Sequence, residues 1–219
     1  MIYWQIQRIL QAEICPIVVA TSTETSDDTL VEYLLSNGIE VFRGSLKDVA
    51  DRFHQALVKY KPSYFVRLTA DCPLVMPTLL QEMNKTFQMN DVDYLSNTIH
   101  PTYPDGLDIE FVKTEAFERM LTITLSSTQR EHVTMGLYQN SHLFKIHRHV
   151  NDIDLSANRW TVDYPDDLRF VREIYNFFKG QETIFTMDDI FKAISSGAIK
   201  DNSLSPDLRN KTNHEEGKA

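Results

Sequence analysis

Apolar residues along this chain switch repeatedly between the spacing of helices and the spacing of strands. Between Ile2 and Leu10 they recur every few positions, which predicts an amphipathic helix over Met1–Glu13. The next apolar run, Ile17–Thr21, is short and β-branched, which is typical of a buried strand. Helices and strands are predicted to alternate in this way through the first half of the chain.

Turn and capping residues define the ends of these elements. Ser26 is predicted to cap the second helix and Gly38 to end it, and Ser45 with Asp48 resembles a capping pair for the third. Strands are predicted over Ile17–Thr21, Glu40–Phe42, Tyr64–Thr69, Asp93–Ser96, Leu107–Val112 and Phe144–Val150. Helices are predicted over Met1–Glu13, Ser26–Asn37, Ser45–Tyr60, Pro77–Gln88, Thr114–Ile123, Gln129–Asn140, Pro165–Phe178 and Met187–Ser195.

This alternation predicts an α/β fold with a mostly parallel sheet and helices on both faces. One domain is expected over residues 1–200, because this length suffices for a single core. Residues 201–219 are expected to form a polar, mobile tail, since few apolar residues anchor them. Ligands of such sheets bind beyond the carboxyl ends of the strands, so polar residues there are the candidates for chemistry.

Composition narrows the class of protein. The formal charge of −9 argues against a general nucleic-acid binder, which would show a basic face. Two cysteines, Cys15 and Cys72, form no disulfide framework and fit a reducing cytoplasm. No apolar run is long enough to span a bilayer, so we expect a cytoplasmic protein without a membrane span.

Two aspartates stand where a divalent cation would be held. Asp71 follows the predicted strand Tyr64–Thr69, and Asp163 comes just before a predicted helix. Carboxylates at such positions suit Mg²⁺ that holds the phosphates of a nucleotide. The alternative is that either aspartate only caps the helix that follows it, as Asp166 or Asp167 could also do.

Other polar motifs allow a functional and a structural interpretation. The run Arg43-Gly44-Ser45 can present an arginine to a phosphate or sugar, or can be a turn with solvated arginines. Asp108 and Glu110 alternate on a predicted strand, where they bind sugar hydroxyls or face water. His132 near a helix start is a possible proton shuttle, although a histidine at the edge of a core is commoner.

In their order along the chain, these runs resemble the spore coat polysaccharide biosynthesis protein F family, which is related to acylneuraminate and Kdo cytidylyltransferases. The resemblance covers nearly the whole chain up to about Phe191. The matching stretches are Ile17–Thr21, Val41–Ser45, Val66–Leu74, Tyr94–Asn97, Tyr103–Glu110, Arg130–Thr134 and Arg159–Leu168.

The resemblance implies a nucleotide-diphospho-sugar transferase fold, a Rossmann-like three-layer sandwich. It also implies a reaction in which a hydroxyl of an acidic or amino sugar attacks the α-phosphate of CTP and pyrophosphate leaves. By this resemblance Asp71 and Asp163 are catalytic residues that bind Mg²⁺. The pocket for the sugar would be lined by Arg43, Arg67, Asp108, Glu110, Arg130 and His132.

The chain departs from the family pattern at its start. Members of the family open with a strand and a loop of the type Q-A-R-x-x-S-x-R-L-P-G-K, whereas Met1–Trp4 aligns with the helix after that loop. No glycine precedes Gly38, so no glycine-rich phosphate loop is formed upstream of it. We therefore expect an N-terminally truncated member of the family that lacks efficient turnover.

Two further functions fit the same residues. The chain could be a non-catalytic remnant that binds a sugar or a protein, or a glycosyltransferase that uses a nucleotide sugar, since the fold and the use of metal are shared. The relatives make a homodimer plausible.

Overall fold

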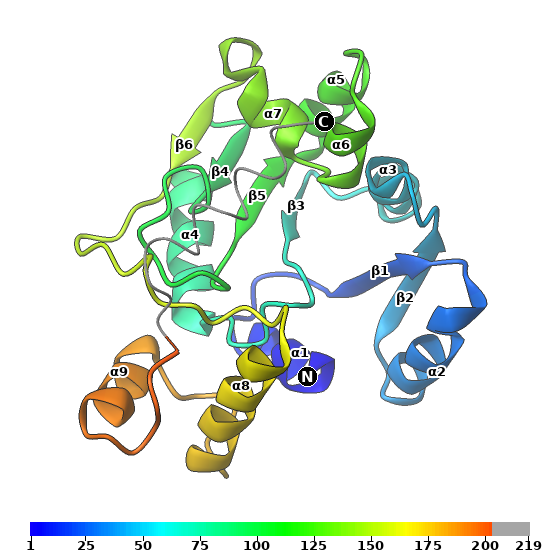
Figure 1. Cartoon of the computed structure of the whole chain (residues 1–219). Helices are drawn as coiled ribbons and strands as arrows, with labels where there is room; N and C mark the ends of the chain where they lie inside the picture. The colour runs from blue at the N-terminus through cyan, green and yellow to red at the C-terminus, as the bar shows by residue number, and fades with distance from the viewer. Residues whose placement is uncertain (203–219) are drawn as a thin grey trace.

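The structure, a computed structural model, describes residues 1–202, and in these residues the strands form two sheets (Figure 1). β1 (Val18–Ser22) pairs in parallel with β2 (Glu40–Gly44). The second sheet has the order β3 (Tyr64–Arg67), β5 (Glu110–Lys113), β4 (Tyr94–Ser96) and β6 (Ile146–Arg148). In this sheet β5 runs against the other three strands, which are parallel to one another. The predicted α/β fold with mostly parallel strands is confirmed.

Helices surround the two sheets and follow the predicted order. They are α1 (Ile2–Leu10), η1 (Thr25–Asp27), α2 (Asp28–Ser36), α3 (Val49–Tyr60), α4 (Pro77–Met89), α5 (Thr114–Leu121), α6 (Ser127–Glu131), α7 (Met135–Gln139), η2 (Ser141–Leu143), α8 (Pro165–Phe177) and α9 (Met187–Ser195). Within residues 1–202 no helix combines the length and the hydrophobicity that crossing a bilayer requires.

The four-stranded sheet separates two hydrophobic cores because neighbouring residues of a strand face opposite sides. Leu95 and Phe111 belong to the core that α4, α8 and α9 cover. Tyr94 and Val112, which are the next residues along β4 and β5, belong to the core that α3, α5 and α7 cover. Helices therefore lie on both faces of the sheet, as in a three-layer sandwich.

The two sheets are not joined by hydrogen bonds between strands. In the described residues β1 pairs with β2 alone and β3 with β5 alone, so each keeps one unpaired edge. All residues of β3 are half-buried, whereas the residues of β4 are buried. The expectation that the chain lacks the first strand of the family fold stays a prediction.

Two predicted helix starts differ from those in the structure. Ser26 does not cap α2; a 3-10 turn precedes this helix, and Asp27 instead accepts hydrogen bonds from Thr21 and Ser22. The cap of α3 is Asp48, which accepts from the Asp51 amide at 2.9 Å.

The strand predicted from Leu107 begins only at Glu110. The side chain of Asn97 bonds the Leu107 carbonyl at 2.7 Å and the Ile109 amide at 2.8 Å, so it replaces a strand partner there. As a result Asp108 lies in the loop before β5.

The single helix predicted over Gln129–Asn140 is two helices, α6 and α7. The chain turns between them at Val133, whose φ is 58°. This turn lets the Thr134 hydroxyl donate to the buried Glu110 carboxylate at 2.6 Å. A tertiary contact thus overrides the helical pattern of the sequence.

The buried Arg8 joins α1 to the C-terminal helices. Its guanidinium donates to the carbonyls of Val75 at 2.7 Å, Glu182 at 2.9 Å and Phe185 at 2.9 Å, and its Cζ lies 3.9 Å from the centre of the Phe185 ring. No carboxylate contributes to these contacts. Burial accordingly lowers the pKa of Arg8 to about 10.

The predicted domain boundary at residue 200 stays a prediction. The last predicted helix, α9, is confirmed and starts with a capping box at Thr186. Of the predicted tail, residues 203–219 lie outside the described residues.

We predict that Arg8→Ala lowers the free energy of unfolding by about 2–4 kcal/mol, because three carbonyls, two of them in buried hydrogen bonds, lose their donor. Urea unfolding followed by circular dichroism measures this. Gln11→Ala, at the exposed end of the same helix, is the control and should change the value by less than about 0.5 kcal/mol. Equal effects of the two substitutions would contradict the role of Arg8.

Candidate functional site

Asp71 lies in the loop that follows β3, and its side chain is exposed. The side chain of Gln5 supports this loop by donating to the carbonyls of Thr69 at 2.7 Å and Cys72 at 3.0 Å. The next helix, α4, starts with Met76 as its cap and receives no side-chain capping bond. Asp71 therefore does not cap a helix, and its carboxylate is available to a ligand.

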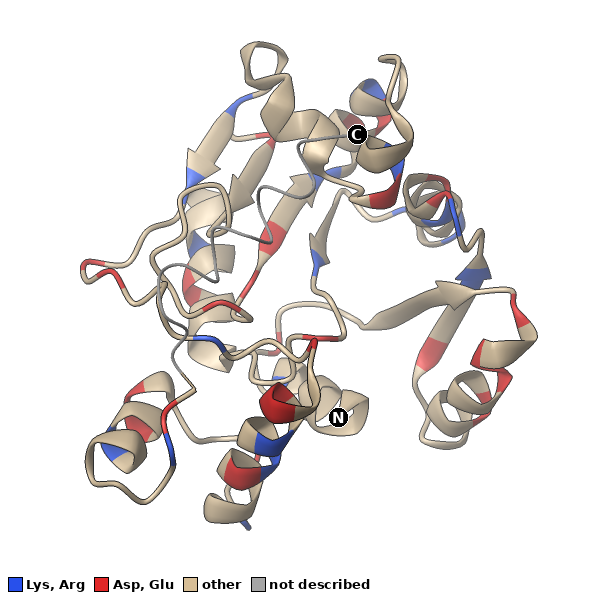
Figure 2. Ribbon diagram, in the orientation of Figure 1, with Lys and Arg blue, Asp and Glu red and all other residues tan. Residues whose placement is uncertain are grey.

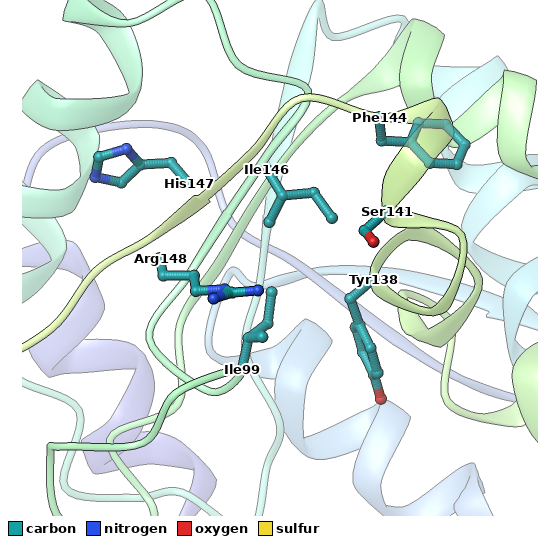
Figure 3. Close-up of a pocket in the computed structure, with 7 residues that line it drawn as sticks. All are labelled: Ile99, Tyr138, Ser141, Phe144, Ile146, His147 and Arg148. Atoms are coloured by element: carbon teal, nitrogen blue, oxygen red, sulfur yellow. The ribbon is translucent and has the colours of Figure 1, made fainter.

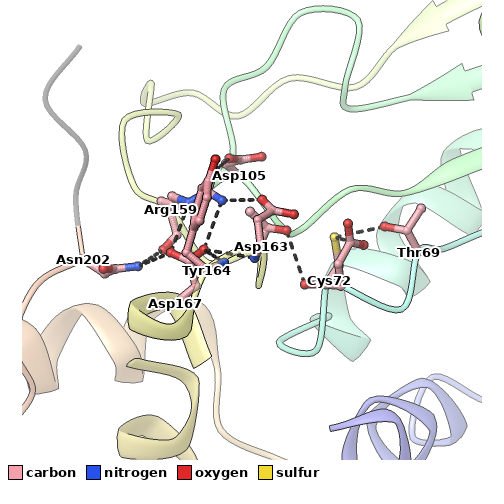
Figure 4. A network of polar contacts seen from close by, with 10 residues as sticks. Thr69, Cys72, Asp105, Arg159, Asp163, Tyr164, Asp167 and Asn202 are labelled. Atoms are coloured by element: carbon pink, nitrogen blue, oxygen red, sulfur yellow. Dashed lines mark hydrogen bonds and ion pairs between the residues drawn. The ribbon is translucent and has the colours of Figure 1, made fainter. Parts of the chain in front are cut away.

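Asp163 is brought beside Asp71 by the backbone. The amide of Val162, the residue before Asp163, donates to the Asp71 carbonyl at 2.8 Å. The hydroxyl of Thr161 approaches the same carbonyl at 3.3 Å. Although they are far apart in sequence, the two predicted metal ligands thus occupy adjacent loops. Figure 4 labels Asp163 on one loop and Cys72, the residue after Asp71, on the other.

The capping alternative for Asp163 is also wrong. Asp167 caps α8 by accepting from the amides of Asp163 and Tyr164, each at 3.0 Å. Asp167 is buried, whereas Asp163 is exposed. Figure 2 shows the acidic positions at the start of α8, the helix that this capping contact begins. Asp163 contributes no cap and is available for other contacts.

A third loop, which carries Asp105 and Asp108, packs on this segment by backbone contacts. The Asp105 amide donates to the Asn158 carbonyl at 2.9 Å, and the Trp160 amide donates to the Asp105 carbonyl at 2.7 Å. Gly106 has a φ of 103°, and a Cβ at this position would lie 2.6 Å from the carbonyl carbon of Trp160. Only glycine permits this approach.

Asp108 is half-buried in this loop, close enough to the other carboxylates to be affected by them. Burial raises its pKa to about 7, with further contributions from the negative charges of Asp105, Glu110 and Asp71. A carboxyl group with this pKa exchanges its proton near neutral pH.

Glu110 is buried and its oxygens are occupied. It accepts hydrogen bonds from Arg67, from Tyr94 and, at 2.6 Å, from Thr134. The alternative that Glu110 faces water is therefore wrong. Its observed role is to hold Arg67 at the end of β3, next to the loop of Asp71.

Three other predicted residues lie on other elements, β2 and α6. Arg43 bonds the carbonyls of Ser22 at 2.8 Å and Glu24 at 2.9 Å, so its guanidinium is not merely solvated. Arg130 donates to Asp48 at 2.7 Å, which joins α6 to the start of α3. His132 is half-buried at the end of α6. Their predicted contacts with a sugar stay predictions.

The sequence reasoning missed Arg159. It is 7% exposed and contacts the carboxylates of Asp105, Asp163 and Asp167. Arg159 and Asp163 are four residues apart, a spacing that brings side chains together within a helix. Because both residues precede α8, this spacing was only a weak signal in the sequence.

No ready-made metal cluster exists in residues 1–202, where no three His, Cys, Asp or Glu side chains are arranged to hold an ion. Two exposed, uncapped carboxylates on adjacent loops nevertheless fit Mg²⁺, which proteins often bind through one or two carboxylates, leaving its other positions to phosphates and water.

A pocket of about 450 Å³ lies elsewhere, along β6 (Figure 3). It is lined by Ile99, Tyr138, Ser141, Phe144, Ile146, His147 and Arg148. β6 is at the opposite edge of the four-stranded sheet from β3, and no carboxylate lines this pocket. It is therefore separate from the aspartate site.

Comparisons with known proteins show which class of protein has this fold. A cytidylyltransferase structure from Leptospira borgpetersenii is 28% identical, covers 92% of this chain and 87% of its own, and superposes with a TM-score of 0.82. A structure of CMP:2-keto-3-deoxy-manno-octonic acid synthetase with CTP shares the fold, with a TM-score of 0.55 at 11% identity over 80% of this chain and 88% of that one.

The family model for cytidylyltransferases matches residues 1–193. Spore coat polysaccharide biosynthesis protein SpsF of Bacillus subtilis is 30% identical over 73% of this chain and 66% of its own length. An uncharacterized protein of Methanocaldococcus jannaschii is 34% identical over 74% of this chain and 66% of its own length. The chain belongs to the cytidylyltransferase family, and the matched region spans about two thirds of these two relatives.

We predict that Gly106→Ala destabilises the protein by roughly 3 kcal/mol or more, because a Cβ would collide with the backbone of Trp160 and Thr161. Gly180→Ala is the matched control. Its φ is also positive, at 85°, but a Cβ there meets no atom within 4 Å. The control should cost only about 1 kcal/mol, and similar melting temperatures for both variants would contradict the close contact.

We also predict a pH effect of Asp108. Its folded pKa lies above the unfolded value of about 3.9, so its protonated form favours folding and that stability is lost as pH rises from about 4 to 7. Asp108→Asn should avoid this loss. The free energy of unfolding of the variant minus that of the parent protein should be roughly 2–4 kcal/mol larger at about pH 8 than at about pH 4. Urea unfolding in EDTA at both pH values measures the difference, and Asp152→Asn, an exposed carboxylate, is the control. A gain that does not depend on pH would contradict the assignment.

Proposed function

We propose that this protein transfers CMP from CTP to a hydroxyl of an acidic or amino sugar, with Mg²⁺ held by Asp71 and Asp163. One observation carries the proposal: the bond from the Val162 amide to the Asp71 carbonyl places two exposed, uncapped aspartates on adjacent loops. Membership of the cytidylyltransferase family supports the choice of CTP. The expectation of inefficient turnover stays a prediction, which pyrophosphate release by the parent protein tests.

In this reaction the sugar oxygen bonds to the α-phosphorus of CTP and the bond to the β-phosphate oxygen breaks, so pyrophosphate leaves. Mg²⁺ would neutralise charge on the phosphate oxygens. The residues of the chain position the two substrates. Asp71 and Asp163 would hold the cation, and Arg67, held by Glu110, adds a positive charge beside the Asp71 loop.

Asp108 is the candidate to accept the proton of the sugar hydroxyl. Its pKa of about 7 means that a large fraction is ionised at neutral pH, while the group remains basic enough to take a proton. It lies on the loop that packs against the Asp163 segment. Arg43, Arg130 and His132 are proposed to contact the sugar from the side of α3 and α6.

SpsF, by its name, acts in spore coat polysaccharide biosynthesis. By analogy, we propose that the product of this protein is an activated sugar for a surface polysaccharide, made in the cytoplasm. Because the match spans about two thirds of such relatives, the activity of the whole protein belongs to this proposal as well.

Two substitutions test the proposed metal ligands. Asp71→Asn and Asp163→Asn should each lower Mg²⁺-dependent CTP binding and pyrophosphate release by about 100-fold or more, since such a cation contributes several kcal/mol. Equilibrium dialysis with labelled CTP and an assay for pyrophosphate measure these effects. Asp166→Asn, an exposed neighbour that pairs with Arg169, is the control and should behave like the parent protein.

The outcomes separate the functional classes. Unchanged CTP affinity in both aspartate variants would exclude the metal assignment. Sugar binding without CTP binding would indicate a non-catalytic binding protein, and hydrolysis of a nucleotide sugar without use of CTP would indicate a glycosyltransferase.

A further inference from the structure

Arg159 pairs with one buried carboxylate, that of Asp167, and with one exposed carboxylate, that of Asp163. Its Nε and Nη2 donate to the two oxygens of Asp167, each at 3.1 Å. Asp167 is buried and also accepts from the amides of Asp163 and Tyr164 and from the Asn202 side chain, so it cannot turn. The two-point contact with Asp167 therefore sets the plane of the Arg159 guanidinium.

The same guanidinium holds Asp163 at one oxygen only. Nη2 of Arg159 pairs with Oδ2 of Asp163, which has a side-chain exposure of 47%. The other oxygen, Oδ1, accepts no hydrogen bond from any residue that the structure describes. An exposed aspartate would otherwise rotate freely, but this one is held in one orientation with one oxygen open (Figure 4).

Arg159 also reaches the loop that carries Asp108. Its Nη1 lies 3.3 Å from Oδ2 of Asp105, and the backbones of the two segments are joined by the bond from Trp160 to Asp105. The orientation of Asp163 and the position of this loop therefore depend on one side chain.

The charges around Arg159 do not cancel. One guanidinium cannot neutralise three carboxylates, so the cluster of Arg159, Asp105, Asp163 and Asp167 keeps a net negative charge. The exposed carboxylate of Asp71 lies on the adjacent loop and adds to it. Such a field attracts a small divalent ion.

We propose that Arg159 is a positioning residue for the divalent cation: it presents Oδ1 of Asp163 to the ion and keeps this ligand in register with the loop of Asp108. The inference rests on the proposed function for the presence of the ion. It adds a requirement for the forked geometry of arginine, which lysine cannot supply because its ammonium is a single point charge.

The competing explanation predicts a different result for Arg159→Lys. If Arg159 only supplies a counter-charge, it repels the ion, and a substitution that keeps the charge should leave ion affinity unchanged. If Arg159 positions Asp163, then Arg159→Lys should weaken ion binding although the charge remains.

The experiment measures Mn²⁺ binding to the full chain by electron paramagnetic resonance. Mn²⁺ replaces Mg²⁺, and no turnover is needed. We expect Arg159→Lys to weaken Mn²⁺ about tenfold, the lower end of what outer-shell partners of metal ligands contribute. Arg169→Lys, which alters an exposed pair on α8, should have no effect. Circular dichroism checks that each variant is folded.

A double substitution distinguishes positioning from a general structural effect. In an Asp163→Asn background, Arg159→Lys should produce no further loss of Mn²⁺ affinity, because Arg159 acts through Asp163. An additive loss, or unchanged affinity of the single Arg159→Lys variant, would overturn the proposal while leaving the metal site intact. Failure of the parent protein to bind Mn²⁺ would overturn the metal site and this proposal together.

A measurement on the unaltered side chain covers the case in which Arg159→Lys does not fold. The ¹⁵N resonance of the Arg159 Nε–H group should shift on addition of Mg²⁺, with the same midpoint as ion binding, and should not shift in Asp163→Asn. A resonance that stays constant at saturating Mg²⁺ would show that Arg159 does not sense the ion, and would overturn the proposal.

Discussion

The site depends on a backbone contact between two loops that are distant in sequence. Asp105 and Gly106 lie directly on the segment from Asn158 to Thr161, and the same segment continues to the Asp71 loop through Val162. Backbone bonds of this kind are short and directional, so they fix the loops more firmly than side-chain packing alone would. Every carboxylate of the candidate site takes its position from this three-loop arrangement.

Two networks of buried polar side chains stabilise the arrangement of the three loops. Glu110 has its oxygens occupied by Arg67, Tyr94 and Thr134, and Arg159 has its guanidinium occupied by three carboxylates. Because a buried charge without partners is costly, these networks tolerate few alternative arrangements. Asp71 and Asp163 are in contrast exposed, and Asp163 has a single side-chain partner, Arg159.

The order of the elements and most of their extents could be predicted from the sequence. Hydrophobic spacing identified α4, α8 and α9 closely, because these helices present one apolar face to a large core. It failed where a side chain distant in sequence intervened: Asn97 bonds backbone groups before β5, and Glu110 accepts from the Thr134 hydroxyl between α6 and α7. Such long-range contacts leave no periodic signal.

For the candidate site, the sequence by itself determined the candidates for chemistry: Asp71, Asp108 and Asp163 stand out as acids beside the ends of predicted elements, and their motifs indicate the family. Tertiary structure alone decided their roles. It assigned the cap of α8 to Asp167, turned Glu110 inward and selected Arg159 as the partner of Asp163. The physical reason is that capping, burial and ion pairing depend on distances between loops, which local sequence patterns do not encode.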